Sequence, residues 1–259
     1  MEINTYKIKT TCLTNIYNEE YLLPFWLNHH KYMFDEIIIV DYRSTDKSLE
    51  ICKSLCPNCK IISSRNKTFG AIEIDEEFMD LEKNIEGIKI ILNTTEFLFC
   101  ETPMSIIFSE LNTPTSFSVT VVSPYSKKQY NINNNYDLLL NLLNDDVVYH
   151  KDRWVRQIHN FSHGNYRLGR HETNNPTINI YEMHIVWLGY YPLNEQLLKR
   201  KLQVQTFIPK TDKDQGFSFQ HFFNKDKLLA INNDKANTGG SLQNTNLALF
   251  NLIKKILNL

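Results

Sequence analysis

Polar side chains that could bind a ligand gather where four apolar runs of the sequence end. The first three runs lead into Asn15, Asp41 and Arg65, each with further polar residues close behind, and the fourth leads into Asn93-Thr94-Thr95-Glu96. Amide and carboxylate groups can hold several hydrogen bonds at once, and a guanidinium pairs with anions. If the four ends meet at one edge of a sheet, they form one ligand site.

The elements that must position these side chains alternate between strands and helices. The strands are predicted at residues 9–15, 36–42, 60–65 and 87–93, and the helices at residues 19–33, 47–56 and 75–86. The run EIIIVDY, Glu36 to Tyr42, is β-branched without interruption from Ile37 to Val40, which is typical of a strand buried on both faces of a parallel sheet. This alternation predicts an α/β fold with an open, mostly parallel sheet flanked by helices, and such sheets bind ligands beyond the carboxyl ends of their strands.

Composition excludes several classes of protein. The 259 residues carry a net charge of -1 and form no Lys/Arg stripe, so a nucleic-acid partner is not expected. No apolar run approaches the roughly 20 residues of a membrane span. The C-terminal LALFNLIKKILNL is amphipathic and is either a helix docked on its own domain or a peripheral contact for a membrane or partner.

The five cysteines are an odd number and no signal peptide precedes them, which predicts a reducing, cytoplasmic location. Cys52, Cys56 and Cys59 have a spacing that resembles a zinc site, but no matching Cys or His pair follows. We therefore interpret Cys52 and Cys56 as small hydrophobic residues on one face of a helix.

Two linked motifs resemble a known family. The segments TNIYNEEYLLPFWLNHH and FDEIIIVDYRSTDKSLEIC are similar to the nucleotide-binding half of GT-A glycosyltransferases of the family 2-like type, over residues 9–100. The resemblance implies a Rossmann-like GT-A fold with a more irregular second half. It also implies one domain at residues 1–259, with a nucleotide-sugar-binding half at 1–100 and an acceptor-binding half at 101–259. The expected activity is sugar transfer from a nucleotide-diphosphate donor, most simply a UDP-sugar, to a saccharide or protein acceptor.

The donor's chemistry agrees with the residue types. An ionised carboxylate such as Asp41 can accept hydrogen bonds from a ribose diol, and a helix N-terminus near Glu19 favours an anion. From position 153 the chain is rich in Arg and His, which suit phosphate, and in Trp and Tyr, which suit sugar rings. The predicted donor-binding residues are Asn15, Asn18, Glu19, Asp41, Ser44, Asp46, Arg65, Asn93, Thr95, Arg170 and His171. For Asp41 and Asp46, ordinary turn and helix-cap chemistry is the alternative.

The family's metal motif is altered. Strand four of these enzymes normally ends in D-x-D, whose aspartates hold Mn²⁺ or Mg²⁺, whereas here the segment is N-T-T-E-F-L with Glu96 as its one carboxylate. Three interpretations remain open. Glu96 and His184, with His171 as second choice, hold a metal; or arginines (Arg65, Arg153, Arg156, Arg170) neutralise the diphosphate; or the protein binds the donor without transfer. We expect an active enzyme with a weak or absent metal requirement, although His184 could also be a core histidine.

The catalytic base is the least determined residue. An inverting transfer needs a carboxylate or histidine near the acceptor hydroxyl, and the candidates are Glu96, Asp212 and His221. His221 belongs to QGFSFQHFF, a predicted loop over the donor or acceptor, and the basic face of LLKRKLQVQ is predicted to be solvated. The competing functions are a nucleotide-sugar-binding protein without transferase activity and, less well supported, a structural or interaction protein.

Overall fold

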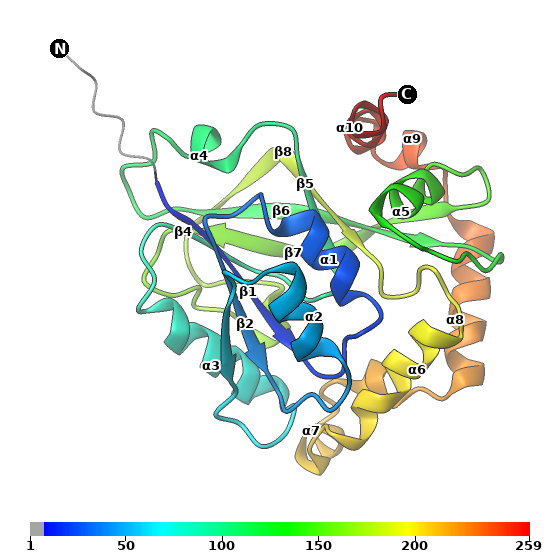
Figure 1. Cartoon of the computed structure of the whole chain (residues 1–259), viewed down its shortest axis with the longest axis horizontal. Helices are drawn as coiled ribbons and strands as arrows, with labels where there is room; N and C mark the ends of the chain where they lie inside the picture. The colour runs from blue at the N-terminus through cyan, green and yellow to red at the C-terminus, as the bar shows by residue number, and fades with distance from the viewer. Residues whose placement is uncertain (1–7) are drawn as a thin grey trace.

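The computed structural model describes residues 8–259, so the first seven residues of the predicted domain lie outside it. The described part contains one eight-stranded sheet in the order β3-β2-β1-β4-β7-β6-β8-β5 (Figure 1). The strands are β1 (Thr10–Ile16), β2 (Glu36–Asp41), β3 (Lys60–Ser63), β4 (Ile88–Ile91), β5 (Glu96–Cys100), β6 (Ser116–Tyr125), β7 (Val148–His159) and β8 (Thr177–Trp187). Four of the seven strand pairings are parallel, and the predicted α/β class with a mostly parallel sheet is confirmed.

The helices cover both faces of this sheet. The α-helices are α1 (Leu23–His30), α2 (Ser48–Leu55), α3 (Ala71–Glu82), α4 (Met104–Ile107), α5 (Asn135–Leu142), α6 (Glu195–Gln203), α7 (Lys210–Asp214), α8 (Lys225–Thr238), α9 (Leu242–Thr245) and α10 (Leu247–Leu257). Three short 3₁₀ turns complete the set: η1 (Leu168–Arg170), η2 (Val204–Thr206) and η3 (Phe219–Phe222).

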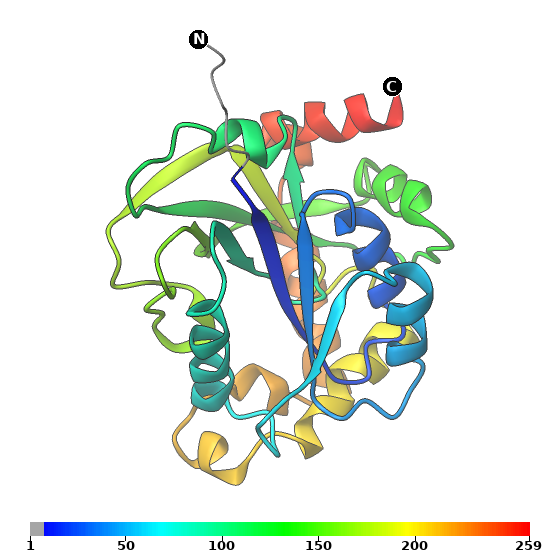
Figure 2. The same ribbon diagram turned by 60° about the vertical axis from the view of Figure 1, so that its left-hand side comes forward.

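Alternating side chains of the first strands explain why helices lie on both sides. Cys12 and Ile39 pack into the cluster that contains residues of α1 and α2, whereas Leu13 and Ile38 pack against Phe78 of α3. Since successive strand residues point to opposite faces, a strand apolar at every position must be covered twice. Figure 2 shows these strands between α3 on one side and the α1–α2 pair on the other.

The second half departs from simple alternation. After β4 the chain turns through residues 92–95, and β5 runs at the far edge of the sheet, antiparallel to β8. The stretch from position 153, which the sequence showed only as rich in polar and aromatic residues, begins within the long strand β7, and this strand is antiparallel to both β4 and β6. The sheet therefore runs without a break from the first half of the chain into the second.

The C-terminal helix and the cysteines complete the fold. Helix α10 buries Leu249, Leu252, Ile253 and Leu257, so the apolar face of this segment packs on its own domain. In the described part of the chain no helix is long and apolar enough to cross a membrane. Cys52 is buried as expected, but Cys56 forms a disulfide with Cys59 at a Cα–Cα distance of 5.3 Å, because it ends α2 and turns toward β3.

Candidate functional site

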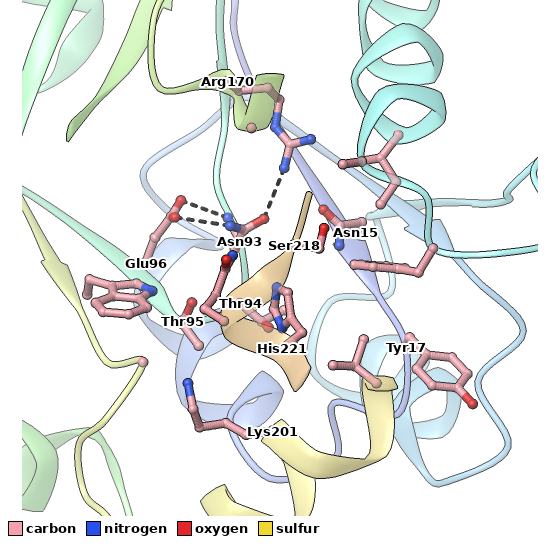
Figure 3. A pocket seen from close by; sticks show the side chains of 18 of the residues that line it. Asn15, Tyr17, Asn93, Thr94, Thr95, Glu96, Arg170, Lys201, Ser218 and His221 are labelled. Carbon is pink, nitrogen blue, oxygen red and sulfur yellow. Dashed lines mark hydrogen bonds between the residues drawn. The ribbon is translucent and has the colours of Figure 1, made fainter. Parts of the chain in front are cut away.

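A cavity of about 500 Å³ opens at the carboxyl ends of β1 and β4, within the size range of small-molecule sites. The start of α3, the turn η1, strands β7 and β8 and the segment from α6 to η3 supply the remaining walls (Figure 3). In Figure 3, Arg170 lies at the top, Glu96 to the left, Tyr17 to the right and Lys201 at the bottom, with Asn93 and His221 between them. Side chains from positions 15 to 221 therefore converge on one space.

Three carboxylates in the cavity wall are each bound by an arginine. Glu96 accepts two bonds from Arg156, at 2.9 Å to Nε and 2.7 Å to Nη2. Glu19 accepts two bonds from Arg200, at 2.5 and 2.6 Å. The third pair joins Asp75 of α3 to Arg170 at 2.5 Å. Each carboxylate is thus neutralised within the protein.

Glu96 is the most enclosed of these carboxylates, with 1% of its surface exposed. Besides Arg156, it accepts hydrogen bonds from the Asn93 backbone N–H at 2.9 Å and from Asn93 Nδ2 at 3.1 Å. Burial by itself raises the pKa of Glu96, but the charge and hydrogen bonds of Arg156 and the Asn93 N–H outweigh it, and the pKa falls below its ordinary value. Glu96 is therefore an ionised structural anchor whose oxygens are already occupied.

Two histidines in the cavity are neutral at pH 7. Burial and the adjacent Arg156 lower the pKa of His171 to about 4, and His171 Nδ1 lies 3.2 Å from Arg156 Nη1. Burial, together with the charges of Lys201 and Arg200, lowers the pKa of His221 to about 4. Either ring can therefore accept a proton but carries no charge toward an anion.

Lys201 is the cation of the cavity that has no carboxylate partner among residues 8–259. Its ammonium lies 4.1 Å from the centre of the Tyr190 ring and 5.8 Å from that of Trp187. Burial and the charge of Arg200 lower its pKa to about 7. The basic face of α6 was predicted to be solvated, and that prediction is wrong for Arg200 and Lys201 because α6 packs over the strand ends.

Aromatic side chains occupy two separate parts of the wall. Tyr17 stacks on Phe207 at 4.3 Å, and Phe69 completes this group near the end of β1. Trp154 and Trp187 meet edge to face at 5.9 Å beside Glu96, since Trp187 is the register partner of Glu96 on β8. Polar residues, Thr94 and Thr95 among them, lie between the two groups.

The structure brings part of the predicted site together. Nine residues that the sequence selected as candidates line the cavity: Asn15, Glu19, Asn93, Thr95, Glu96, Arg156, Arg170, His171 and His221. The Oδ1 atom of Asn15 and the Nε atom of Arg170 are buried, and neither has a hydrogen-bond partner in the described part of the chain.

Other predicted donor residues lie elsewhere. Asn18 and Asp46 border a neighbouring groove, where Asn18 Oδ1 accepts the Thr45 N–H at 2.7 Å. Asp41 and Ser44 form a turn instead, in which Asp41 Oδ1 accepts the Ser44 N–H at 3.0 Å. The expectation that all four strand ends line one cavity is therefore wrong for β2 and β3.

Glu77 of α3 explains why the ends of β2 and β3 are closed. Its carboxylate accepts hydrogen bonds from the Tyr42 hydroxyl at 2.5 Å, the Ser64 hydroxyl at 2.7 Å and the Arg65 N–H at 2.7 Å. The Arg65 side chain points outward and pairs with Asp80 at the surface. These contacts seal the sheet edge beside the cavity.

Two further candidates fall outside the cavity. Asp212 accepts the Ala71 N–H at 2.8 Å and thereby joins α7 to the start of α3. His184 lies on β8 opposite Phe99, and its Nδ1 contacts Asn246 Nδ2 at 3.1 Å. Glu96 and His184 thus do not meet, and the described residues contain no group of three His, Cys, Asp or Glu side chains suited to a metal.

Comparison with known proteins relates the first part of the chain to one family. Residues 11–73 match the family model described as Glycosyl transferase family 2, the family expected from the two linked motifs. This segment contains nearly all of β1 together with α1, β2, α2 and β3, and its three strands form one end of the sheet. No curated protein shows significant similarity to the chain.

Solved structures of two proteins match part of this chain. The crystal structure of S. aureus TarS 1-349 has 20% identity and a TM-score of 0.34, covering 49% of this chain and 38% of that one. Its complex with UDP-GlcNAc gives 19% identity and a TM-score of 0.31, covering 49% and 36%. Glucosyl-3-phosphoglycerate synthase from Mycobacterium tuberculosis, in complex with Mn²⁺, UDP and glucosyl-3-phosphoglycerate, has 16% identity and a TM-score of 0.28, covering 35% and 34%. The chain spans less than two fifths of the length of each.

Proposed function

We propose that the protein is a glycosyltransferase that moves a sugar from a nucleotide-diphosphate donor, a UDP-sugar in the simplest case, to a saccharide or protein hydroxyl. One observation carries the proposal: a single cavity in a family 2-type fold has aromatic groups in two parts of its wall and polar and cationic groups between them. A nucleotide sugar has the same order of chemistry, with a flat base, a charged diphosphate and a sugar ring.

The parts of the donor can be assigned to these groups. We propose that the base binds beside Tyr17 and Phe69, where the unpaired Oδ1 of Asn15 accepts a hydrogen bond from it. The sugar would bind on Trp154 and Trp187, because indole rings pack well on the apolar faces of sugars. The diphosphate would lie between them, beside Thr95 and Lys201.

For the transfer we propose His221 as the base. The acceptor oxygen attacks the anomeric carbon, the bond from that carbon to the phosphate oxygen breaks, and the nucleoside diphosphate leaves. The acceptor's proton passes to the neutral ring of His221, which lines the cavity. Glu96 is less suited to this role because Arg156 and Asn93 already occupy its oxygens.

A nucleotide-sugar-binding protein without transferase activity is the alternative. It is favoured by one observation, namely that the three carboxylates of the cavity are all paired with arginines. Titration with UDP and several UDP-sugars tests binding, and slow release of free sugar from a bound UDP-sugar tests catalysis. Binding without any release or transfer would favour the alternative, and absence of nucleotide binding would contradict both functions.

The proposed assignment predicts different effects for two aromatic residues. Tyr17→Ala should weaken UDP and UDP-sugar equally, by about tenfold, because a base stacked on an aromatic ring gains roughly 1–3 kcal/mol. Trp154→Ala should weaken the UDP-sugar by a similar factor and leave UDP unchanged. Tyr181→Ala is the control, since Tyr181 is 74% exposed on β8 away from the cavity. Equal loss of both ligands in Trp154→Ala would refute the placement of the sugar.

A further inference from the structure

We infer that this cavity binds a nucleoside diphosphate without a divalent cation, and that the ammonium of Lys201 meets the charge of the phosphates. The inference rests on the proposed function for the identity of the ligand. It goes beyond that function by naming the group that replaces the family's metal.

The residues at the family's metal position do not fit Mn²⁺ or Mg²⁺. Such cations prefer charged oxygen ligands, whereas Asn93 and Thr95 are neutral. Asn93 Oδ1 accepts a hydrogen bond from Arg170 Nη2 at 3.2 Å, and both oxygens of Glu96 are bound by Arg156. A cation at this position would also lie close to two guanidinium groups. This position therefore disfavours a metal for two reasons: its side chains are neutral or already bonded, and two positive charges lie close to it.

The charges of the cavity wall sum to a positive value. Three carboxylates (Glu19, Asp75, Glu96) are balanced by three arginines (Arg156, Arg170, Arg200), and Lys201 adds one further positive charge when it is protonated. Anions are attracted to such a wall, and the low dielectric of a half-buried cavity strengthens this attraction. The positive charge of the cavity wall therefore favours the binding of a phosphate group.

Lys201 is better placed for this contact than the arginines first considered. Arg65 pairs with Asp80 at the surface, and Arg153 is exposed and does not line the cavity. Arg156 and Arg170 use their guanidinium groups to hold Glu96 and Asp75. The Lys201 side chain instead lines the cavity without a carboxylate partner in the described part of the chain, and its ammonium, 4.1 Å from the centre of the Tyr190 ring, has three N–H donors to offer an anion.

Binding of a phosphate to Lys201 should be accompanied by uptake of a proton. The titratable and charged groups around Lys201 are Arg200 on the same helix, His221 on η3 and Tyr190 after β8, and Arg200 is itself paired with Glu19. With a pKa of about 7, the free lysine is mostly neutral at pH 8. A phosphate in contact favours the charged form, so the protein should take up a proton when the ligand binds at pH 8.

The test is calorimetric titration of UDP, GDP and ADP into the full chain, each with EDTA and with Mn²⁺. At least one should bind equally well in both, and at pH 8 its binding heat should vary with the ionisation enthalpy of the buffer, which reports proton uptake. Lys201→Met should weaken that ligand about 10- to 100-fold, the range for losing a charge-assisted hydrogen bond. Lys201→Arg should keep most of the affinity but lose the proton uptake, because arginine stays charged.

Lys199→Met is the matched control, since Lys199 lies on the same helix with 77% of its side chain exposed and outside the cavity. Unchanged thermal unfolding of each variant separates binding from folding. Binding that needs Mn²⁺, or unchanged affinity in Lys201→Met, would overturn the inference and leave the proposed function intact. No binding of any of the three nucleotides under either condition would overturn both.

Discussion

Replacing Arg156 with methionine is expected to lower the free energy of unfolding by about 3–5 kcal/mol, the range for breaking a buried ion pair from one side. Arg156 and Glu96 expose only 3% and 1% of their side chains, so the variant leaves an unpaired carboxylate in the interior. Urea denaturation at pH 7 measures the change. Arg167→Met is the control, because Arg167 and Glu172 form a pair with both side chains 65% exposed, and such pairs contribute at most about 1 kcal/mol.

The pH dependence of this loss identifies its cause. In the wild type the pKa of Glu96 is lowered, so its contribution to stability is present above the unfolded-state pKa and is lost as pH falls through the folded-state value. In Arg156→Met, burial raises that pKa and the carboxyl becomes protonated. The difference between the two proteins should therefore shrink toward acid pH, and adding Glu96→Gln to the variant should restore part of the stability. A loss below about 1 kcal/mol in Arg156→Met would contradict the ion pair's importance.

The first half of the fold could be predicted because its signals are local. The apolar run of β2 and the polar turns between strands and helices can each be recognised within a few residues of sequence. The alternating order of strands and helices then predicts parallel pairing. The second half could not be read in the same way. The turn after β4 sends β5 to the opposite edge of the sheet, and nothing in the sequence of residues 92–95 specifies that distant partner.

The site could be predicted only in part, and the reason is the same: its local signals can be recognised in the sequence, but its distant partners cannot. Asn15, Asn93 and Glu96 were found because they follow strands, and His221 because its segment is aromatic. The partners that decide what Glu96 can do are remote, since Arg156 is 60 residues away in the chain. Lys201 was missed because a basic stretch such as LLKRK is usually solvated, and only the packing of α6 over the strand ends makes it part of the cavity.

Transfer activity is expected to show a pH optimum between the pKa values of two cavity residues. The proposed base, His221, must be neutral, so kcat/KM should fall below its pKa of about 4. Lys201 must be charged to meet the phosphates, so kcat/KM should fall as the pH rises above about 7. The profile of kcat/KM against pH, which reports the free enzyme, measures both limits.

Three variants assign these limits to residues. His221→Asn should reduce kcat about 10²- to 10⁴-fold, the usual contribution of a general base, and should remove the acid limit. His171→Asn tests whether the acid limit belongs to the other histidine, whose pKa is also about 4 but whose Nδ1 contacts Arg156. Lys201→Arg should move the alkaline limit upward, since arginine does not lose its charge in this range. If His221→Asn keeps the wild-type kcat and His171→Asn does not, the base is His171 and the acceptor must approach from the side of Trp154, on whose ring His171 packs.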